Sequence, residues 1–102
     1  MDINKLLKEA ESLQKNLTKV QDELAHIDVT GTSGGGSVTV LMTAQGAIKD
    51  IKIKKEVVNP DDIETLEDLV LAALKDATVK AVEISQSKLG NLTGGLGGLP
   101  GF

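Results

Sequence analysis

The first 27 residues carry an unbroken heptad repeat, and this repeat limits what the chain can fold into. Its apolar positions alternate in steps of three and four residues, with no glycine or proline between them. This spacing is typical of a helix that presents a narrow apolar seam to another helix. We therefore expect a helix over residues 2–26 that pairs with a second helix, of the same chain or of a second copy. The seam residues are Ile3, Leu6, Ala10, Leu13, Leu17, Val20, Leu24 and Ile27.

Lysines lie on the opposite side of this predicted helix. Lys5, Lys8, Lys15 and Lys19 occupy the c and f positions of the heptad, away from the seam. Such a stripe is either a solvated face that keeps the helix soluble or a row of contacts to phosphate groups. The pattern by itself leaves both interpretations open.

After residue 27 the apolar period becomes two. Alternating runs near residue 29, over residues 38–43 and over residues 47–55 predict three strands. Their short connections favour an antiparallel meander. Apolar residues on both faces of the second strand place it at the centre of the sheet, covered by other elements. In the third strand isoleucines alternate with lysines, so the lysines share one face.

A second long helix is predicted to follow residue 59. Asn59 is a suitable cap, Pro60 suits the first helical position, and Asp61 and Asp62 suit the positive end of the helix dipole. We expect this helix to end before Gly90. Its apolar face is wider than a sheet needs, which predicts a dimer interface. The predicted interface residues are Ile63, Leu66, Val70, Ala73, Ala77, Ala81 and Ile84.

The element order α-β-β-β-α predicts an α+β fold in one domain, residues 1–89, which suits a chain of 102 residues. Residues 90–102 follow as a tail in which 6 of 13 residues are glycine. This composition does not offset the entropy of ordering, so we expect a flexible segment whose leucines are candidates for docking on a partner. These are Leu92, Leu96 and Leu99. No signal peptide or membrane span is expected.

The glycine-rich stretch VTGTSGGGSVTV, residues 29–40, departs from known phosphate-binding loops. A P-loop requires lysine where Ser37 stands, and a dinucleotide fingerprint requires glycine where Thr39 stands. A strand is predicted to follow it, so no helix N-terminus points at the loop. We interpret the stretch as a hairpin connection, because glycine adopts positive φ at no steric cost.

Residues for catalysis or metal binding are scarce. The chain has no cysteine, and its one histidine, His26, falls at the end of the first predicted helix. There it favours the helix dipole, and the nearby acids Glu23 and Asp28 do not complete a metal site. We expect no enzyme, no metal, no cofactor and no small-molecule substrate.

The net charge of −4, from 11 lysines and 15 acidic residues, argues weakly against a nucleic-acid partner. The charge is uneven, however. Residues 1–55 hold 8 lysines and 7 acids, whereas residues 56–102 hold 3 lysines and 8 acids. One end of the folded chain is therefore expected to be much less acidic than the whole.

Three stretches resemble the YbaB/EbfC family of nucleoid-associated proteins. They are the glycine-rich stretch with its TGTSGGG, NPDDIETLEDLVLAALKDA at residues 59–77, and GGLPGF at residues 97–102. The resemblance covers nearly the whole chain. It implies a cytoplasmic protein of the nucleoid, a homodimer built around the sheet and the C-terminal helices, and binding to duplex DNA.

The resemblance favours the lysines as DNA contacts. The chain has no arginine, and Thr78 and Val79 stand where many members carry basic residues. Binding is therefore expected to be weak, sensitive to salt and of low sequence preference. The alternative is a dimeric adaptor that binds another protein through its first helix and its tail, which the net charge favours. The candidate DNA contacts are Lys5, Lys8, Lys15, Lys19, Lys52, Lys54 and Lys55.

Overall fold

The computed structural model describes residues 2–94 and confirms the α+β fold with the element order α-β-β-β-α. Side chains are described as far as residue 91. The elements are α1 (Ile3–Ala25), β1 (Asp28–Ser33), β2 (Val38–Thr43), β3 (Ile48–Ile53) and α2 (Ile63–Gly94). Short 3-10 turns, Gly34–Gly36 and Lys55–Val57, follow β1 and β3.

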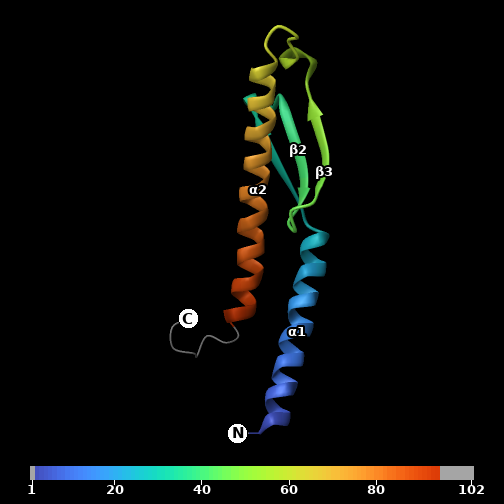
Figure 1. Ribbon diagram of the computed structural model, residues 1–102, viewed down its shortest axis with the longest axis vertical. Coiled ribbons are helices and arrows are strands. Elements are labelled where there is room, and N and C mark those ends of the chain that lie inside the picture. The colour runs from blue at the N-terminus through green and yellow to red at the C-terminus, as the bar shows by residue number, and fades with distance from the viewer. Residues whose placement is uncertain (1, 95–102) are drawn as a thin grey trace.

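The three strands form one antiparallel sheet in the order β1-β2-β3, as the short connections predict. Val40 of the central strand lies opposite Gly31 of β1 and Ile51 of β3. Helix α2 lies across one face of the sheet, where it contacts β1 and β2 (Figure 1). Val38 and Val40 point toward this helix and are fully buried, whereas Leu41 on the other face is half-buried. The prediction that β2 is central is confirmed, but only one of its faces is fully covered.

Small residues allow α2 to approach the sheet closely. Ala73, Ala77 and Ala81 lie four residues apart and are 0%, 0% and 3% exposed. A Cβ atom on Gly31 would overlap the carbonyl oxygen of Ala73 and the amide nitrogen of Ala77. The helix backbone therefore occupies the space that any side chain at residue 31 would need.

The glycine-rich stretch is a hairpin connection, as predicted. Gly34, Gly35 and Gly36 have φ angles of 57°, 67° and 93°, in the region that favours glycine. The Ser33 hydroxyl donates to the Leu69 carbonyl oxygen at 2.6 Å and so ties the turn to α2. The next element is the strand β2, so the turn does not open onto a helix N-terminus.

The predicted start of the second helix is wrong. Asn59 to Asp62 form a turn, in which the Asp62 N–H donates to the Asn59 carbonyl oxygen at 2.9 Å. Pro60 takes the second position of this turn, which its fixed φ favours. Asp62 accepts from the Thr65 N–H at 3.2 Å and from its hydroxyl at 2.6 Å, so it satisfies the first turn of α2. Asp62 rather than Asn59 therefore caps the helix.

The predicted end of this helix is also wrong, because α2 continues through Gly90 to Gly94. Glycine costs a helix about 1 kcal/mol relative to alanine. Tertiary contacts just before it offset this cost. Leu89 is half-buried, and Lys88 forms an ion pair with Glu23 of α1 at 3.2 Å. The rest of the predicted tail, residues 95–102, lies outside the described residues.

The molecule is elongated, with principal extents of 69 × 25 × 17 Å. The first half of α2 covers the sheet, and its last half runs antiparallel beside the end of α1 (Figure 1). Leu24, in the last turn of α1, is 1% exposed. The N-terminal half of α1 extends beyond the end of α2.

Candidate nucleic-acid interface

Helix α1 carries the first group of predicted DNA contacts. The Asp2 side chain caps the helix by accepting from the Asn4 N–H at 3.0 Å. Lys5, Lys8, Lys15 and Lys19 are all exposed. At a rise of 1.5 Å per residue, the group extends over about 21 Å of the helix.

Strand β3 and the residues after it carry the second group. Lys52, opposite Thr39 of β2, is exposed, as are Lys54 and Lys55. Lys52 and Asp50 line the same shallow hollow of about 210 Å³ on the sheet face away from α2. The Asp50 carboxylate lowers the positive potential around Lys52.

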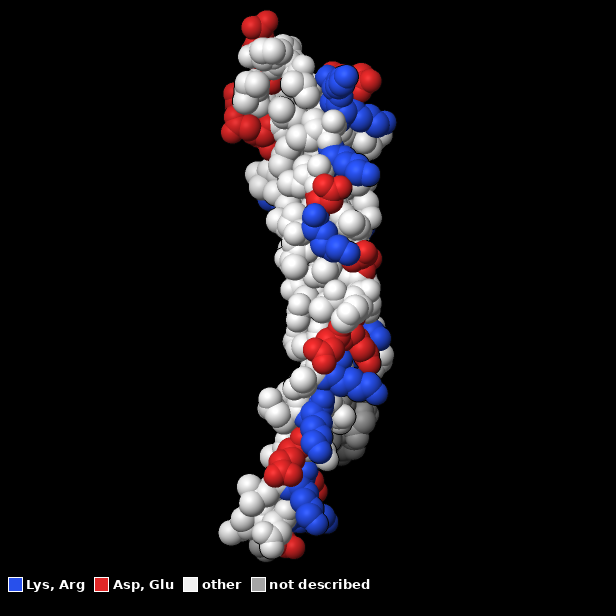
Figure 2. Space-filling view, turned by 90° about the vertical axis from the view of Figure 1, so that its right-hand side faces the viewer, with Lys and Arg blue, Asp and Glu red and all other residues white. Residues whose placement is uncertain are grey.

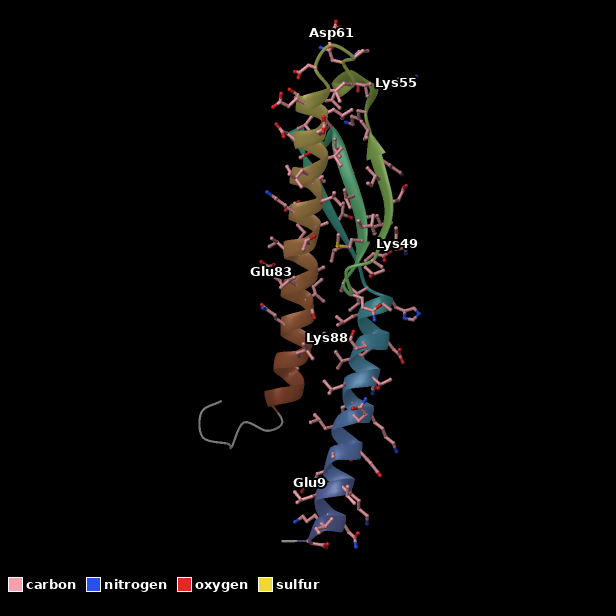
Figure 3. All side chains as sticks on the ribbon, in the orientation of Figure 1. Glu9, Lys49, Lys55, Asp61, Glu83 and Lys88 are labelled. Atoms are coloured by element: carbon pink, nitrogen blue, oxygen red, sulfur yellow. The ribbon has the colours of Figure 1, made fainter. Side chains whose placement is uncertain are left out.

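The two groups lie along one side of the molecule. Figure 2 shows lysines in a column that follows the long axis, over β3 at one end and over α1 at the other. Acidic residues interrupt the column, so its potential is mixed. In Figure 3, Lys49 and Lys55 lie on the β3 side, and Glu83 lies on the opposite side, on α2. We use the name lysine face for the seven predicted contacts and Lys49, which are exposed lysines of α1, of β3 and of the residues after β3.

The lysines differ in whether a carboxylate already holds them. Within residues 2–94, ion pairs join Lys49 to Asp28, Lys80 to Asp76, and Lys88 to Glu23, each at 3.2 Å. The seven predicted DNA contacts are outside this set of ion pairs. Their ammonium groups therefore need to break no ion pair of the described residues before they meet a phosphate.

The structure divides the predicted dimer interface into two parts. Ala73, Ala77 and Ala81 are covered by the sheet of their own chain, so they have no surface left for a second copy. Ile84 also packs against this core and is half-buried. The sequence showed one apolar face on this helix, but it did not show which part of that face the sheet covers.

Two of the three remaining predicted residues line an apolar cleft between α2 and β3, and the third is exposed. Leu66 and Val70 line this cleft, whose volume is about 400 Å³, and Ile63 is 48% exposed in the first turn of α2. The predicted interface omitted the four other lining residues. The alternation of β3 was the signal that could have found Ile53, because it places this side chain on the α2 side. The four are Ile53, Glu67, Leu71 and Leu74.

His26 has the structural role that the sequence favoured. It is the C-cap residue of α1, and its Nδ1–H donates to the Asp22 carbonyl oxygen at 2.8 Å. Over residues 2–94, no three His, Asp or Glu side chains gather as a metal site would require. Neither described helix combines the length and the apolar character that crossing a bilayer requires.

The chain is similar to proteins of one family over nearly its whole length. The model of the YbaB/EbfC DNA-binding family matches residues 1–96. A nucleoid-associated protein of Acetivibrio thermocellus is 48% identical over 101 residues, which cover 99% of this chain and 89% of that protein. A nucleoid-associated protein of Rhodococcus opacus is 47% identical over 106 residues, which cover 99% of this chain and 94% of that protein. The crystal structure of an uncharacterized protein from Helicobacter pylori has the same fold, with a TM-score of 0.81 at 23% identity over 90% of this chain and 97% of that one. The chain belongs to the YbaB/EbfC DNA-binding family.

Proposed function

We propose that the protein is a nucleoid-associated protein that binds duplex DNA as a homodimer through its lysine face. It acts in the cytoplasm, at the nucleoid, by binding and not by catalysis. The observation that carries the proposal is the column of lysines along one side of an elongated molecule, with seven of them outside the ion pairs of the described residues. The family and the names of the relatives support the same partner.

The dimensions of the molecule suit a duplex that runs along its long axis. One chain is 69 Å long, which corresponds to about 20 base pairs at about 3.4 Å per pair. Lysine is a point charge on a long side chain, and it recognises phosphate without the bidentate geometry of arginine. The protein therefore binds the DNA backbone and has little preference among base sequences.

The proposal is tested by the salt dependence of binding. Each phosphate contact contributes about −0.9 to the slope of log K against log salt. A dimer that engages about half of its α1 lysines has a slope of roughly −3 to −4. We expect the double substitution Lys8→Gln and Lys15→Gln to weaken binding and to flatten the slope by one or two units, measured by fluorescence anisotropy with a labelled duplex. Because both residues are exposed and glutamine is a good helix former, folding should be unchanged.

Lys75→Gln is the matched control. Lys75 is exposed on α2 and is outside the proposed set of contacts, so its loss changes net charge without removing a phosphate contact. We expect Lys8→Gln and Lys15→Gln, each alone, to flatten the slope, and Lys75→Gln to leave it unchanged. If the double variant binds like the parent at every salt concentration, the α1 stripe is a solvated face.

A second candidate function is a dimeric adaptor that binds another protein. The exposed part of the α1 seam favours it, since Ile3 is 70% exposed and Leu6 is 45% exposed. Single apolar residues at a surface are common, but a periodic row is typical of helix pairing. Absence of DNA binding at low salt, in a protein that is folded and dimeric, would favour this candidate.

The homodimer is proposed from the apolar cleft beside β3. Five of its six lining residues are apolar and the sixth is Glu67, so water covers mostly apolar side chains there. Leu71, at the rim, is 50% exposed. A second copy placed over this cleft would bury these atoms and leave the lysine face open to DNA.

A further inference from the structure

The apolar seam of α1 is covered at one end and bare at the other. Leu24 is 1% exposed, and Leu17 and Val20 are half-buried. In the first half of the helix, Ile3 is 70% exposed and Leu13 is 42% exposed. We call the uncovered part the bare seam; its residues are Ile3, Leu6, Ala10 and Leu13.

Helix α2 covers the apolar seam of α1 only as far as its own C-terminal end. The two helices run antiparallel, and Lys88 of α2 reaches Glu23 of α1 at 3.2 Å. One helical turn later, Asn91 lines the same cleft as Asn16. Helix α2 ends at Gly94, beside the middle of α1 and close to the point where the seam becomes bare.

The remaining eight residues, GLGGLPGF, have the length and the spacing to cover the bare seam. Leu96, Leu99 and Phe102 follow one another at intervals of three. In a polyproline II conformation, residues three apart share one face and lie about 9 Å apart. Successive heptads of a helix repeat every 10 Å or so. Eight such residues extend over about 25 Å, and α1 needs about 20 Å from Asn16 to Ile3.

We propose that residues 95–102 dock along the bare seam of α1 in their own chain, with Leu96, Leu99 and Phe102 against its apolar residues. The segment has no charged side chain, so docking removes no charged side chain from water. It is tethered at the place where the seam becomes bare, and a tether raises the effective concentration of the segment well above that of a second copy. The seam and the lysines occupy different sides of α1, so a docked segment leaves the lysine face open. The segment also prevents the bare seams of two molecules from pairing as a coiled coil.

Paramagnetic relaxation tests the proposal in the full chain. The natural sequence has no cysteine, so Gly101→Cys gives one site for a nitroxide label. We expect the label to broaden the methyl signals of Ile3, Leu6 and Leu13 and to spare those of Ile53 and Leu71 at the other end of the molecule. Equal broadening everywhere, or none, would overturn docking on the seam.

A mixed sample separates docking within a chain from docking on a second copy. Nitroxide-labelled chains without isotope are mixed with isotope-labelled chains that carry no nitroxide. We expect no broadening at the seam in this mixture. Broadening there would assign the segment to the seam of a second copy and overturn docking within the chain.

The apolar contacts are tested by the substitutions Leu96→Ser and Leu99→Ser together. This pair should abolish the broadening, with Gly95→Ser and Gly98→Ser as the control that retains both leucines. The leucine variant should also self-associate more strongly by sedimentation velocity, because its seam is uncovered. Broadening that survives in the leucine variant would refute the apolar contact. The Lys8→Gln and Lys15→Gln variant should keep its broadening, so loss of DNA binding and loss of docking are separate results.

Discussion

The carboxylate of Asp76 in α2 accepts a hydrogen bond from the backbone N–H of Thr32, at 2.9 Å, on the outer edge of β1. Beside it, the Lys80 ammonium donates to the Thr30 carbonyl oxygen at 2.8 Å and to Asp76 at 3.2 Å. An edge strand with free N–H and C=O groups is a template for pairing with another chain. Two side chains of the helix thus occupy backbone groups that would otherwise be open to a further strand.

We therefore expect Asp76→Ala to expose the edge of β1. The variant should unfold at lower urea concentration than the parent, because the Thr32 N–H and Lys80 lose a partner. It should also form concentration-dependent oligomers in sedimentation velocity. Asp68→Ala, an exposed acid on the same helix, is the control and should show neither effect. Identical behaviour of the two variants would mean that the hydrogen bond at the edge has no role in stability or association.

Acid should remove the contribution of Asp76 to stability. The Thr32 N–H, and next the Lys80 ammonium, hold the pKa of Asp76 below its ordinary value of 3.8. Because the pKa is lower in the folded state, this stability is complete above about pH 4 and is lost as pH falls through the folded-state pKa. We expect the difference in urea midpoint between the parent and Asp76→Asn to be constant near neutral pH and to shrink below pH 4. A difference that persists at pH 2 would assign the effect to packing.

Local patterns in the sequence predicted most of the fold. The heptad repeat predicted α1, the period of two predicted the strands, and the glycines predicted the turn at Gly34–Gly36. These three predictions succeeded because each feature depends on residues that are close in the chain. Both ends of α2 were misplaced for the same reason. Asn59 and Asp62 are both good caps, and only the turn at Pro60 decides between them. Gly90 has a low helix propensity, which predicts the end of a helix. The helix continues beyond it because of contacts with α1.

The candidate site was less accessible from sequence, because its details depend on distant contacts. The hydrogen bond between Thr32 and Asp76 joins residues 44 positions apart. Nothing local distinguishes Lys80, which contacts the edge of β1, from Lys75, which is exposed. Likewise, the sequence places Gly31 in a glycine-rich turn. Its role in close packing becomes visible only when the position of α2 against the sheet is known.

The close approach at Gly31 gives a sharp test of the packing between α2 and the sheet. We expect Gly31→Ala to lower the free energy of unfolding by about 3 kcal/mol, since the helix backbone must move to admit the methyl group. Gly90→Ala is the matched control, because its Cβ would meet no atom within 4 Å. That substitution should raise the stability by up to about 1 kcal/mol. Urea denaturation measures both, and effects of the same sign would contradict the packing shown here.

The turn at Gly34–Gly36 should bind no nucleotide. Ser37 replaces the lysine that holds phosphate in a P-loop, and β2 follows where a helix would supply its N-terminus. Calorimetric titration with ATP and with GTP should give no saturable heat. Binding of one nucleotide per chain that is lost on substitution of Ser37 would show that the turn is a ligand site after all.

The apolar cleft beside β3 makes the proposed dimer testable by one substitution. Leu71 is 50% exposed at the rim of the cleft, so Leu71→Gln should leave the fold of a single chain intact. In a symmetric dimer the substitution occurs twice, and each loss of a buried leucine costs about 1.5–3 kcal/mol. The dissociation constant should therefore rise by about a hundredfold or more. Sedimentation equilibrium at micromolar concentration measures the change.

Val79→Gln is the control for this experiment. Val79 is 56% exposed on α2, outside the residues that line the cleft, so it has the same kind of exposed apolar side chain in a different place. The parent and Val79→Gln should sediment at twice the chain mass, and Leu71→Gln should approach the mass of one chain. A parent that is monomeric would remove the dimer from the proposed function. A Leu71→Gln variant as dimeric as the parent would instead place the interface away from the cleft, and the bare seam of α1 would then be the next surface to test.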